Sequence, residues 1–286
     1  MTILVGFSTS RQSDAPINLA IRIARSSGQS IVAAAVAERS WPPRSDPVED
    51  EYVDYVTEQA RSSLQRVVDR VRGDLDIPVV IHQSASVPAG LLELGTEHRA
   101  SMVVVGSSSS GLLGRVALGS VTDRLVHTAA IPVAIAPRGY PATPEALTRI
   151  TAAYGGEADL NGLVAAAAGL AKAWSMPMRI VSFSVRPFSI EPAENLVVGR
   201  WAQRMEDEVT EQLKRVRQNF AVPDVDVVVG TGRTWRDAVE GVSWDPGELL
   251  ALGSGAAGTR SHVFLGSAAA KIIRHSPVPA LILPRQ

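Results

Sequence analysis

The chain has 286 residues, of which 45% are apolar and 20% charged, and its 28 basic residues nearly balance its 29 acidic residues. This composition excludes an intrinsically disordered chain, and the lack of a basic excess argues against a general nucleic-acid binder. The chain contains no cysteine, which excludes disulfides, thiol nucleophiles and thiolate metal sites. No basic segment precedes the apolar start, and no apolar run reaches the roughly 18 residues of a membrane helix. We therefore expect a cytoplasmic protein with no membrane contact.

The sequence contains one unit twice. Residues 102–138 align with residues 249–285 at a constant shift of 147, and the same shift carries Ile3 onto Ile150. The shift also superimposes the glycine and serine positions of the two units: Gly106 on Gly253, and Gly119-Ser120 on Gly266-Ser267. We predict two tandem domains, 1–138 and 149–286. The connecting linker, 139–148, contains Gly139, Pro141 and Pro144, which disfavour regular structure.

Short apolar segments alternate with helical patterns along each unit. In the first unit the expected strands are Ile3–Phe7, Ser30–Val36, Val79–His82, Met102–Val105 and Val133–Ala136. Apolar residues recur at helical spacing from Val53 to Val71, and again from Val197 to Phe220 in the second unit. Uniformly apolar strands separated by helices are typical of a parallel sheet covered on both faces. The predicted fold class is α/β, with two tandem five-stranded doubly wound parallel-sheet domains.

The segment after the fourth strand is rich in small residues in both units. In doubly wound sheets the ligand binds beyond the carboxyl ends of the strands. Small residues let a ligand approach the backbone, and amides at the start of the next helix can hold an anion. The candidate residues are Gly106, Ser107, Ser109, Gly119, Ser120 and Val121 in the first unit, and Gly253, Ser254, Gly266 and Ser267 in the second. An ordinary turn and helix cap would use the same residue types, and this alternative stays open.

The local charge favours an anionic ligand. Residues 249–286 contain no Asp or Glu, whereas Arg260, Lys271, Arg274 and Arg285 are present. A positive field near a helix start favours phosphate over a neutral ligand. The alternative is that these cations are solvated and only balance acidic residues elsewhere.

The duplicated glycine and serine positions resemble those of the universal stress protein family, in its tandem two-domain form. The resemblance implies an adenine nucleotide alpha hydrolase-like fold, with ATP phosphates held by the motif G-x2-G-x9-G-[S/T] and an Asp near the adenosine. The second motif glycine is replaced by Ser109 in one unit and Ala256 in the other, and the Asp by Ser8 and Gly155. Backbone contacts to adenine are implied at Val36 and Val185.

The resemblance implies a non-catalytic stress-response protein that binds ATP with Mg²⁺ or a related nucleotide. The alternative is a protein-interaction or scaffold module that has lost ATP binding through these replacements. A protein partner or a homodimer is also implied, and pairing of the last strands of the two units would form a pseudo-dimer within the chain. We assign no catalytic and no metal-binding residue, and weak ATP hydrolysis has no support in the residue pattern.

The string Gly253-x-Gly255-x-x-Gly258 matches a dinucleotide-binding pattern. It follows the fourth strand rather than the first, and no acidic residue lies downstream to hold a ribose. The histidines show no spacing typical of metal ligands. Neither pattern indicates a site.

Overall fold

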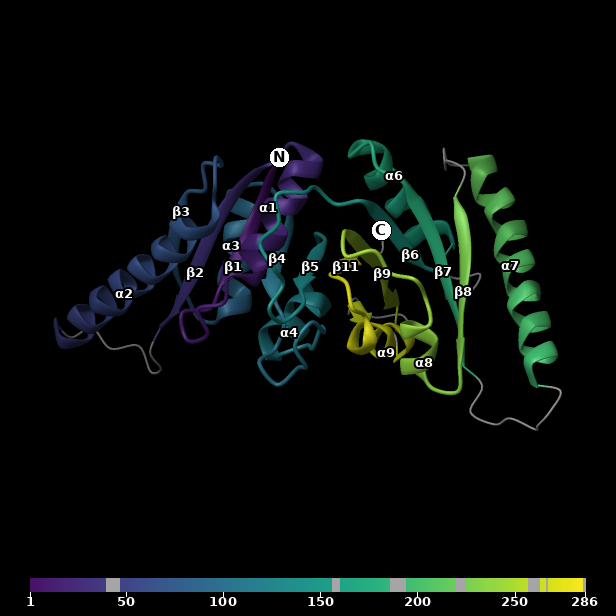
Figure 1. The fold of residues 1–286 in the computed structure, drawn as a ribbon. Helices are drawn as coiled ribbons and strands as arrows, with labels where there is room; N and C mark the ends of the chain where they lie inside the picture. Colours follow the sequence, from purple (N-terminus) through teal and green to yellow (C-terminus); the bar gives the residue numbers. More distant parts are fainter. Residues whose placement is uncertain are drawn as a thin grey trace. The chain divides into compact units, whose positions relative to one another are not determined.

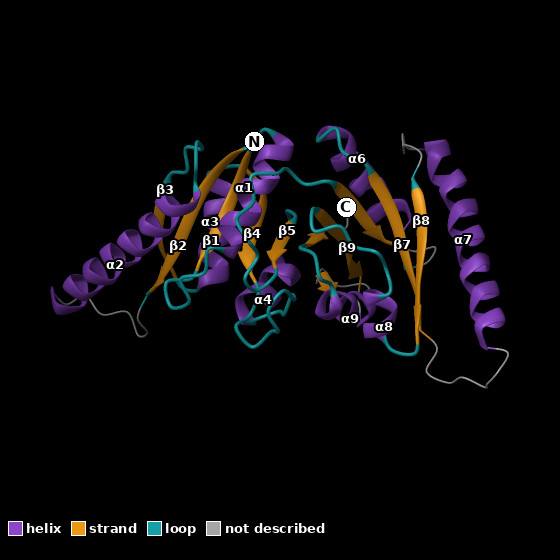
Figure 2. Ribbon diagram, viewed as in Figure 1, coloured by secondary structure: helices purple, strands orange, loops and turns teal. Residues whose placement is uncertain are grey.

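The computed structural model describes residues 1–39, 47–155, 160–185, 194–219, 225–256, 263–265 and 267–284. The chain divides into two compact units, Met1–Ala146 and Leu147–Gln286 (Figure 1). In both units the strands form a sheet with helices packed against it (Figure 2). Within the described ranges, no helix is long and apolar enough to cross a membrane.

The first unit is a parallel sheet with the strand order β3-β2-β1-β4-β5. Its strands are β1 (Thr2–Phe7), β2 (Ser30–Glu38), β3 (Val79–Ser84), β4 (Ala100–Gly106) and β5 (Val133–Ala136). Its helices are α1 (Ala15–Ser27), α2 (Pro47–Val71), α3 (Val87–Glu97) and α4 (Ser120–Thr128). Helix α1 contacts α2, and α3 contacts α4. Right-handed crossovers place these two pairs on opposite faces of the sheet, so the apolar strands are covered on both sides.

The second unit has the corresponding order β8-β7-β6-β9-β11. Its parallel strands are β6 (Arg149–Ala153), β7 (Met178–Val185), β8 (Asp226–Gly232), β9 (Glu248–Ala256) and β11 (Ala280–Leu283). Its helices are η1 (Leu160–Val164), α6 (Ala165–Ala173), α7 (Glu194–Asn219), α8 (Trp235–Glu240) and α9 (Ser267–His275). A short strand, β10 (Val263–Leu265), pairs with β9 in the antiparallel direction.

The predicted α/β class and the parallel sheet in each unit are confirmed. Strand β2 continues to Glu38, so Val36 lies two residues before its end rather than at its end. Residues 139–146, which we predicted as linker, lack regular structure but pack on α1. Asn18 Nδ2 donates to the Tyr140 carbonyl at 3.0 Å, and Arg22 Nε donates to the Ala146 carbonyl at 3.2 Å. This part of the segment therefore belongs to the first compact unit.

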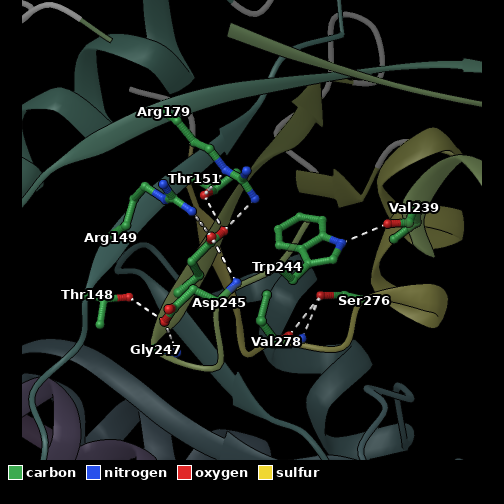
Figure 3. A network of polar contacts seen from close by, with 11 residues as sticks. Thr148, Arg149, Thr151, Arg179, Val239, Trp244, Asp245, Gly247, Ser276 and Val278 are labelled. Atoms are coloured by element: carbon green, nitrogen blue, oxygen red, sulfur yellow. Dashed lines mark hydrogen bonds and ion pairs between the residues drawn. The ribbon is translucent and has the colours of Figure 1, made fainter. Parts of the chain in front are cut away.

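A buried charge cluster joins three strands of the second unit at their amino ends (Figure 3). Glu248, the first residue of β9, is fully buried. Its Oε2 atom accepts hydrogen bonds from Arg179 Nη2 at 2.8 Å and from Thr151 Oγ1 at 2.7 Å, and Arg149 pairs with Oε1. The Arg179 guanidinium also lies 5.2 Å from the ring centroid of Trp244. Burial lowers the pKa of Arg179, while the charge of Glu248 opposes this shift.

The first unit has a neutral counterpart of this cluster. The 147-residue shift places Thr2 on Arg149 and Ser101 on Glu248. Ser101 Oγ donates to the Thr2 carbonyl at 3.2 Å and to Gln29, and Thr2 Oγ1 lies 3.2 Å from Ser30 Oγ. Because its residues lie at the amino ends of β6, β7 and β9, the charge cluster of the second unit is at the end of the sheet opposite the carboxyl ends, where a ligand is expected. We attribute to it a role in stability rather than in binding.

Replacing Glu248 with Ala should destabilise the second unit by about 3–5 kcal/mol, because it leaves the guanidinium of Arg179 buried without a carboxylate. Urea unfolding followed by tryptophan fluorescence measures this effect, since four of the five tryptophans lie in residues 147–286. Ser101→Ala, the matched change in the first unit, should cost only about 1 kcal/mol. Equal effects of the two substitutions would contradict the assignment.

Candidate functional site

The loop between β4 and α4 is closed by hydrogen bonds between its two ends. The backbone amide of Ser108 donates to the Ala117 carbonyl at 2.7 Å. The Ser107 hydroxyl accepts from the amide of Ala117 at 2.6 Å and lies 3.1 Å from the carbonyl of the same residue. The hydroxyl of Ser107, one of the candidate residues, is therefore engaged inside the loop. The exposed Ser109 makes no such contact through its hydroxyl in the described residues.

Arg138, which follows β5, holds the outer part of this loop. Its Nη1 atom donates to the carbonyls of Ser109 at 3.2 Å and Gly111 at 2.9 Å. Its backbone accepts from the amide of Gly114 at 2.9 Å and donates to the carbonyl of Arg115 at 3.0 Å. From the sequence, Arg138 is only the last residue of the repeated segment 102–138. Its role in the loop depends on contacts across more than 20 residues, for which the sequence carries no signal.

The amino end of helix α4 is not capped by a side chain. Gly119 is the N-cap, with φ −95° and ψ 173°, and it has no side chain to accept from the first helical amides. The first hydrogen bond within the helix runs from the Asp123 amide to the Gly119 carbonyl at 2.8 Å. Within the described chain, the amides of Ser120 and Val121 thus have no acceptor, and the Ser120 side chain is exposed. These amides and the helix dipole can bind an anion.

Internal packing does not require glycine at Gly106 or Gly119. A Cβ atom on Gly106 would lie 3.6 Å from Pro16 Cδ, and one on Gly119 would lie 3.4 Å from the Cβ of Ser108. Both distances correspond to ordinary contacts, and neither glycine has a positive φ. A close approach by a ligand would explain why both positions lack a side chain.

Of the candidates Ser8 and Val36, only Ser8 has an exposed side chain at the carboxyl edge of the sheet. Ser8 follows β1, the neighbour of β4, so it lies at the same carboxyl edge as Gly106. Its side chain is exposed, with Oγ 3.1 Å from Ser10 Oγ. Val36 lies inside β2, and a Cβ on Gly90 would lie only 2.7 Å from its Cγ1 atom. The Val36 side chain therefore packs against α3.

The second unit differs from the first after its fourth strand. Strand β9 continues past Gly253, and Ser254, Gly255 and Ala256 pair with β10. Our prediction of a loop is wrong for these residues, because an antiparallel ribbon replaces it. A Cβ on Gly253 would lie 3.6 Å from the Cβ of Leu163, which is buried.

The other candidates of the second unit lie at several places along the chain. Ser267 begins α9 and is exposed, Gly155 lies beyond β6 and is exposed, and Val185 ends β7. Gly266 lies outside the described residues. The described residues of this unit therefore contain the start of the following helix but no open loop at Ser254–Ala256.

Comparison with known proteins identifies the family. The model of the universal stress protein family matches residues 1–137 and again 147–284. The chain belongs to the universal stress protein family. The universal stress protein Rv2319c of Mycobacterium tuberculosis strain H37Rv is 36% identical over 295 residues, which cover 99% of this chain and 100% of that protein. This universal stress protein thus has the tandem two-domain form.

Solved structures agree with this fold. A universal stress protein from Archaeoglobus fulgidus matches with a TM-score of 0.62 and 18% identity, over 100% of this chain and 98% of its own. A structure from Pseudomonas aeruginosa described as a putative universal stress protein matches with a TM-score of 0.59 and 12% identity, over 99% of this chain and 93% of its own. At these identities the likeness concerns the fold alone.

Replacing Arg138 with Met should loosen the β4–α4 loop, because two carbonyls lose a charged donor. Such hydrogen bonds contribute about 1.5–3 kcal/mol each, so amide exchange in residues 107–119 should become at least about tenfold faster. Hydrogen exchange with mass spectrometry measures the change. The control is Arg124→Met, which removes an exposed charge from α4 and should leave the exchange of the loop unchanged. An unchanged rate in Arg138→Met would show that the side chain does not hold the loop.

Proposed function

We propose that this universal stress protein binds an adenine nucleotide through the first unit, with its phosphates at the start of α4. The proposal rests mainly on the open amides of Ser120 and Val121 behind a glycine N-cap. Gly106 and Ser8 lie at the same edge of the sheet, where a nucleotide would extend away from its phosphates. The motif by which the chain resembles nucleotide-binding family members places its third glycine at Gly119.

The first unit is the better candidate for binding. Its loop between β4 and α4 leaves the helix start open, whereas the corresponding segment of the second unit is paired with β10. Ser8 and Ser109 can still donate or accept hydrogen bonds, but Gly155 and Ala256 at the matched positions have no polar side chain. We therefore expect one nucleotide for each chain.

The proposed role is binding, and we assign no residue to catalysis. Among the described residues, no group of three or more His, Cys, Asp or Glu side chains could hold a metal ion. Mg²⁺ would therefore enter as part of the nucleotide complex, held by phosphate oxygens, while the chain supplies the amides. Bound nucleotide would stabilise the loop that Arg138 also holds, and so alter the surface of the first unit.

A protein-interaction role without nucleotide is the second candidate. Ser8 replaces the Asp that the family resemblance implies, and a lost charged acceptor weakens binding by about 1.5–3 kcal/mol. The antiparallel ribbon after Gly253 is consistent with a second unit that has lost the site. If this second candidate is correct, the purified protein should carry no bound nucleotide.

Titration of the full chain with ATP and Mg²⁺, followed by isothermal calorimetry and thermal unfolding, tests the proposal. We expect saturable binding of one nucleotide and a higher unfolding temperature, because ligand that binds only the native state stabilises it. Two solved universal stress proteins are described as complexes with cAMP and with dAMP, so the series includes both. No heat and no shift at millimolar ATP would favour the interaction module instead.

Gly119→Val should weaken ATP binding at least about tenfold, which corresponds to 1.4 kcal/mol. The branched side chain would obstruct the approach to the amides of Ser120 and Val121. The matched control is Gly266→Val, the same change at the counterpart in the second unit, which should leave the affinity unchanged. The reverse result would assign the nucleotide to the second unit. Equal affinities of both variants and the unaltered chain would contradict binding at either helix start.

A further inference from the structure

The large apolar side chains exposed in the described residues gather in two patches of the first unit. Leu112 and Leu113 are 68% and 76% exposed in the middle of the β4–α4 loop, residues 107–119. Tyr52 and Tyr55 are 59% and 64% exposed near the start of α2, and Val48 is 73% exposed beside them. Apart from Met1, these are all the large apolar residues described as exposed. Single exposed apolar residues are common, but gathered ones mark interaction sites.

The first patch, Gly111–Arg115, is here named the loop tip. Arg138 holds it at both ends, through the Gly111 carbonyl at 2.9 Å and the Gly114 amide at 2.9 Å. The two leucines are thus displayed by a hydrogen-bonded turn rather than by a loose chain. The charged side chains of this region, Arg115 and Arg138, are both cations, and residues 107–122 contain no Asp or Glu.

The second patch, here named the α2 hollow, has the opposite charge. Residues 47–55 contain four carboxylates, Glu49, Asp50, Glu51 and Asp54, and no basic residue. Tyr52 borders a small, open depression in this surface. The apolar part of its lining comes from Ala37, Val53 and Val56, and the polar part from Glu38, Arg39 and Gln83. Arg39 is a cation, but Glu38 and the four carboxylates of residues 47–55 outnumber it, so the patch is acidic on balance. An apolar group that carries positive charge beside it fits this surface.

The loop tip cannot reach the α2 hollow of its own unit. Helix α2 packs on β2 and β3, while the loop tip is tied to the chain that follows β5. Strands β1 and β4 lie between these two edges of the sheet (Figure 1). A contact between the two patches therefore requires two molecules.

We propose that the loop tip of one copy docks in the α2 hollow of a second copy of this chain. Leu112 and Leu113 lie against Tyr52 and the apolar wall of the hollow, which removes both exposed patches from water. Arg115 and Arg138 face the carboxylates at the start of α2. Both surfaces expose apolar side chains, and the charges beside them are of opposite sign.

This contact is head-to-tail, because each copy contributes a different surface. Heterologous contacts of this kind extend into open chains or close into rings. The 147-residue shift places Thr259 and Arg260 at the positions of Leu112 and Leu113, so each chain has one leucine pair. Such a small contact gives weak association, and its charged rim makes the association weaker at high salt.

Sedimentation velocity of the full chain at increasing protein concentration tests the proposal with two variants. The tip variant carries Leu112→Asp and Leu113→Asp, and the hollow variant carries Tyr52→Lys and Tyr55→Lys. The unaltered chain should show an average mass that rises with concentration and falls when salt is added. Each variant alone should associate at least about tenfold more weakly. The control is Thr259→Asp with Arg260→Asp, which should associate like the unaltered chain.

An equal mixture of the two variants distinguishes this head-to-tail contact from a symmetric contact between two identical surfaces. The intact hollow of the tip variant should bind the intact loop tip of the hollow variant, and association should stop at a heterodimer. Circular dichroism confirms that each variant is folded, and serine at the same positions replaces any variant that is not. An unaltered chain that keeps the mass of one copy throughout, a variant that still associates, or a mixture without heterodimer would overturn the proposal.

Discussion

The hydrogen bonds that close the β4–α4 loop determine what the first unit presents at the carboxyl end of its sheet. The Ser108 amide on the Ala117 carbonyl joins the two ends of the loop, and Arg138 holds the segment between them. Because of this closure, the start of α4 is left open and the two leucines project at the loop tip. The proposed nucleotide site and the proposed docking surface therefore depend on the same hydrogen bonds, those that close the β4–α4 loop.

The two units have the same sheet but have diverged at both ends of it. At the amino ends, the second unit contains a buried Arg–Glu–Arg cluster where the first has neutral hydroxyl and backbone contacts. At the carboxyl ends, the first unit has a closed loop and the second an antiparallel ribbon. The parallel sheet tolerates both changes because its apolar faces, not its ends, supply most of the buried surface. Duplication thus allows one unit to change at the carboxyl edge of its sheet while the other has a closed loop there.

Charge is distributed unevenly along a chain whose net charge is only −1. The start of α2 is acidic, and the region from the loop tip to Arg138 is basic apart from Asp123. The net charge of the chain does not reveal that acidic and basic regions are separate. Electrostatic fields act only within about 10 Å at moderate salt, so each region acts locally. Both proposals depend on the local fields rather than on the net charge.

The sequence by itself determined the duplication, the alternation of strands and helices that builds a parallel sheet, and the position of the Gly119-Ser120 helix start. These follow from local periodicity and from small residues at repeated spacing, which act over a few residues. Only the tertiary structure decided that the Ser107 hydroxyl is used inside its loop, that Arg138 holds that loop, and that β10 pairs with β9 in the antiparallel direction. Each of these depends on partners distant in the chain: Ala117 lies 10 residues from Ser107, and Arg138 lies 27 residues from Gly111. Pairing over such distances is set by how the sheet brings strand ends together, and no local pattern encodes it.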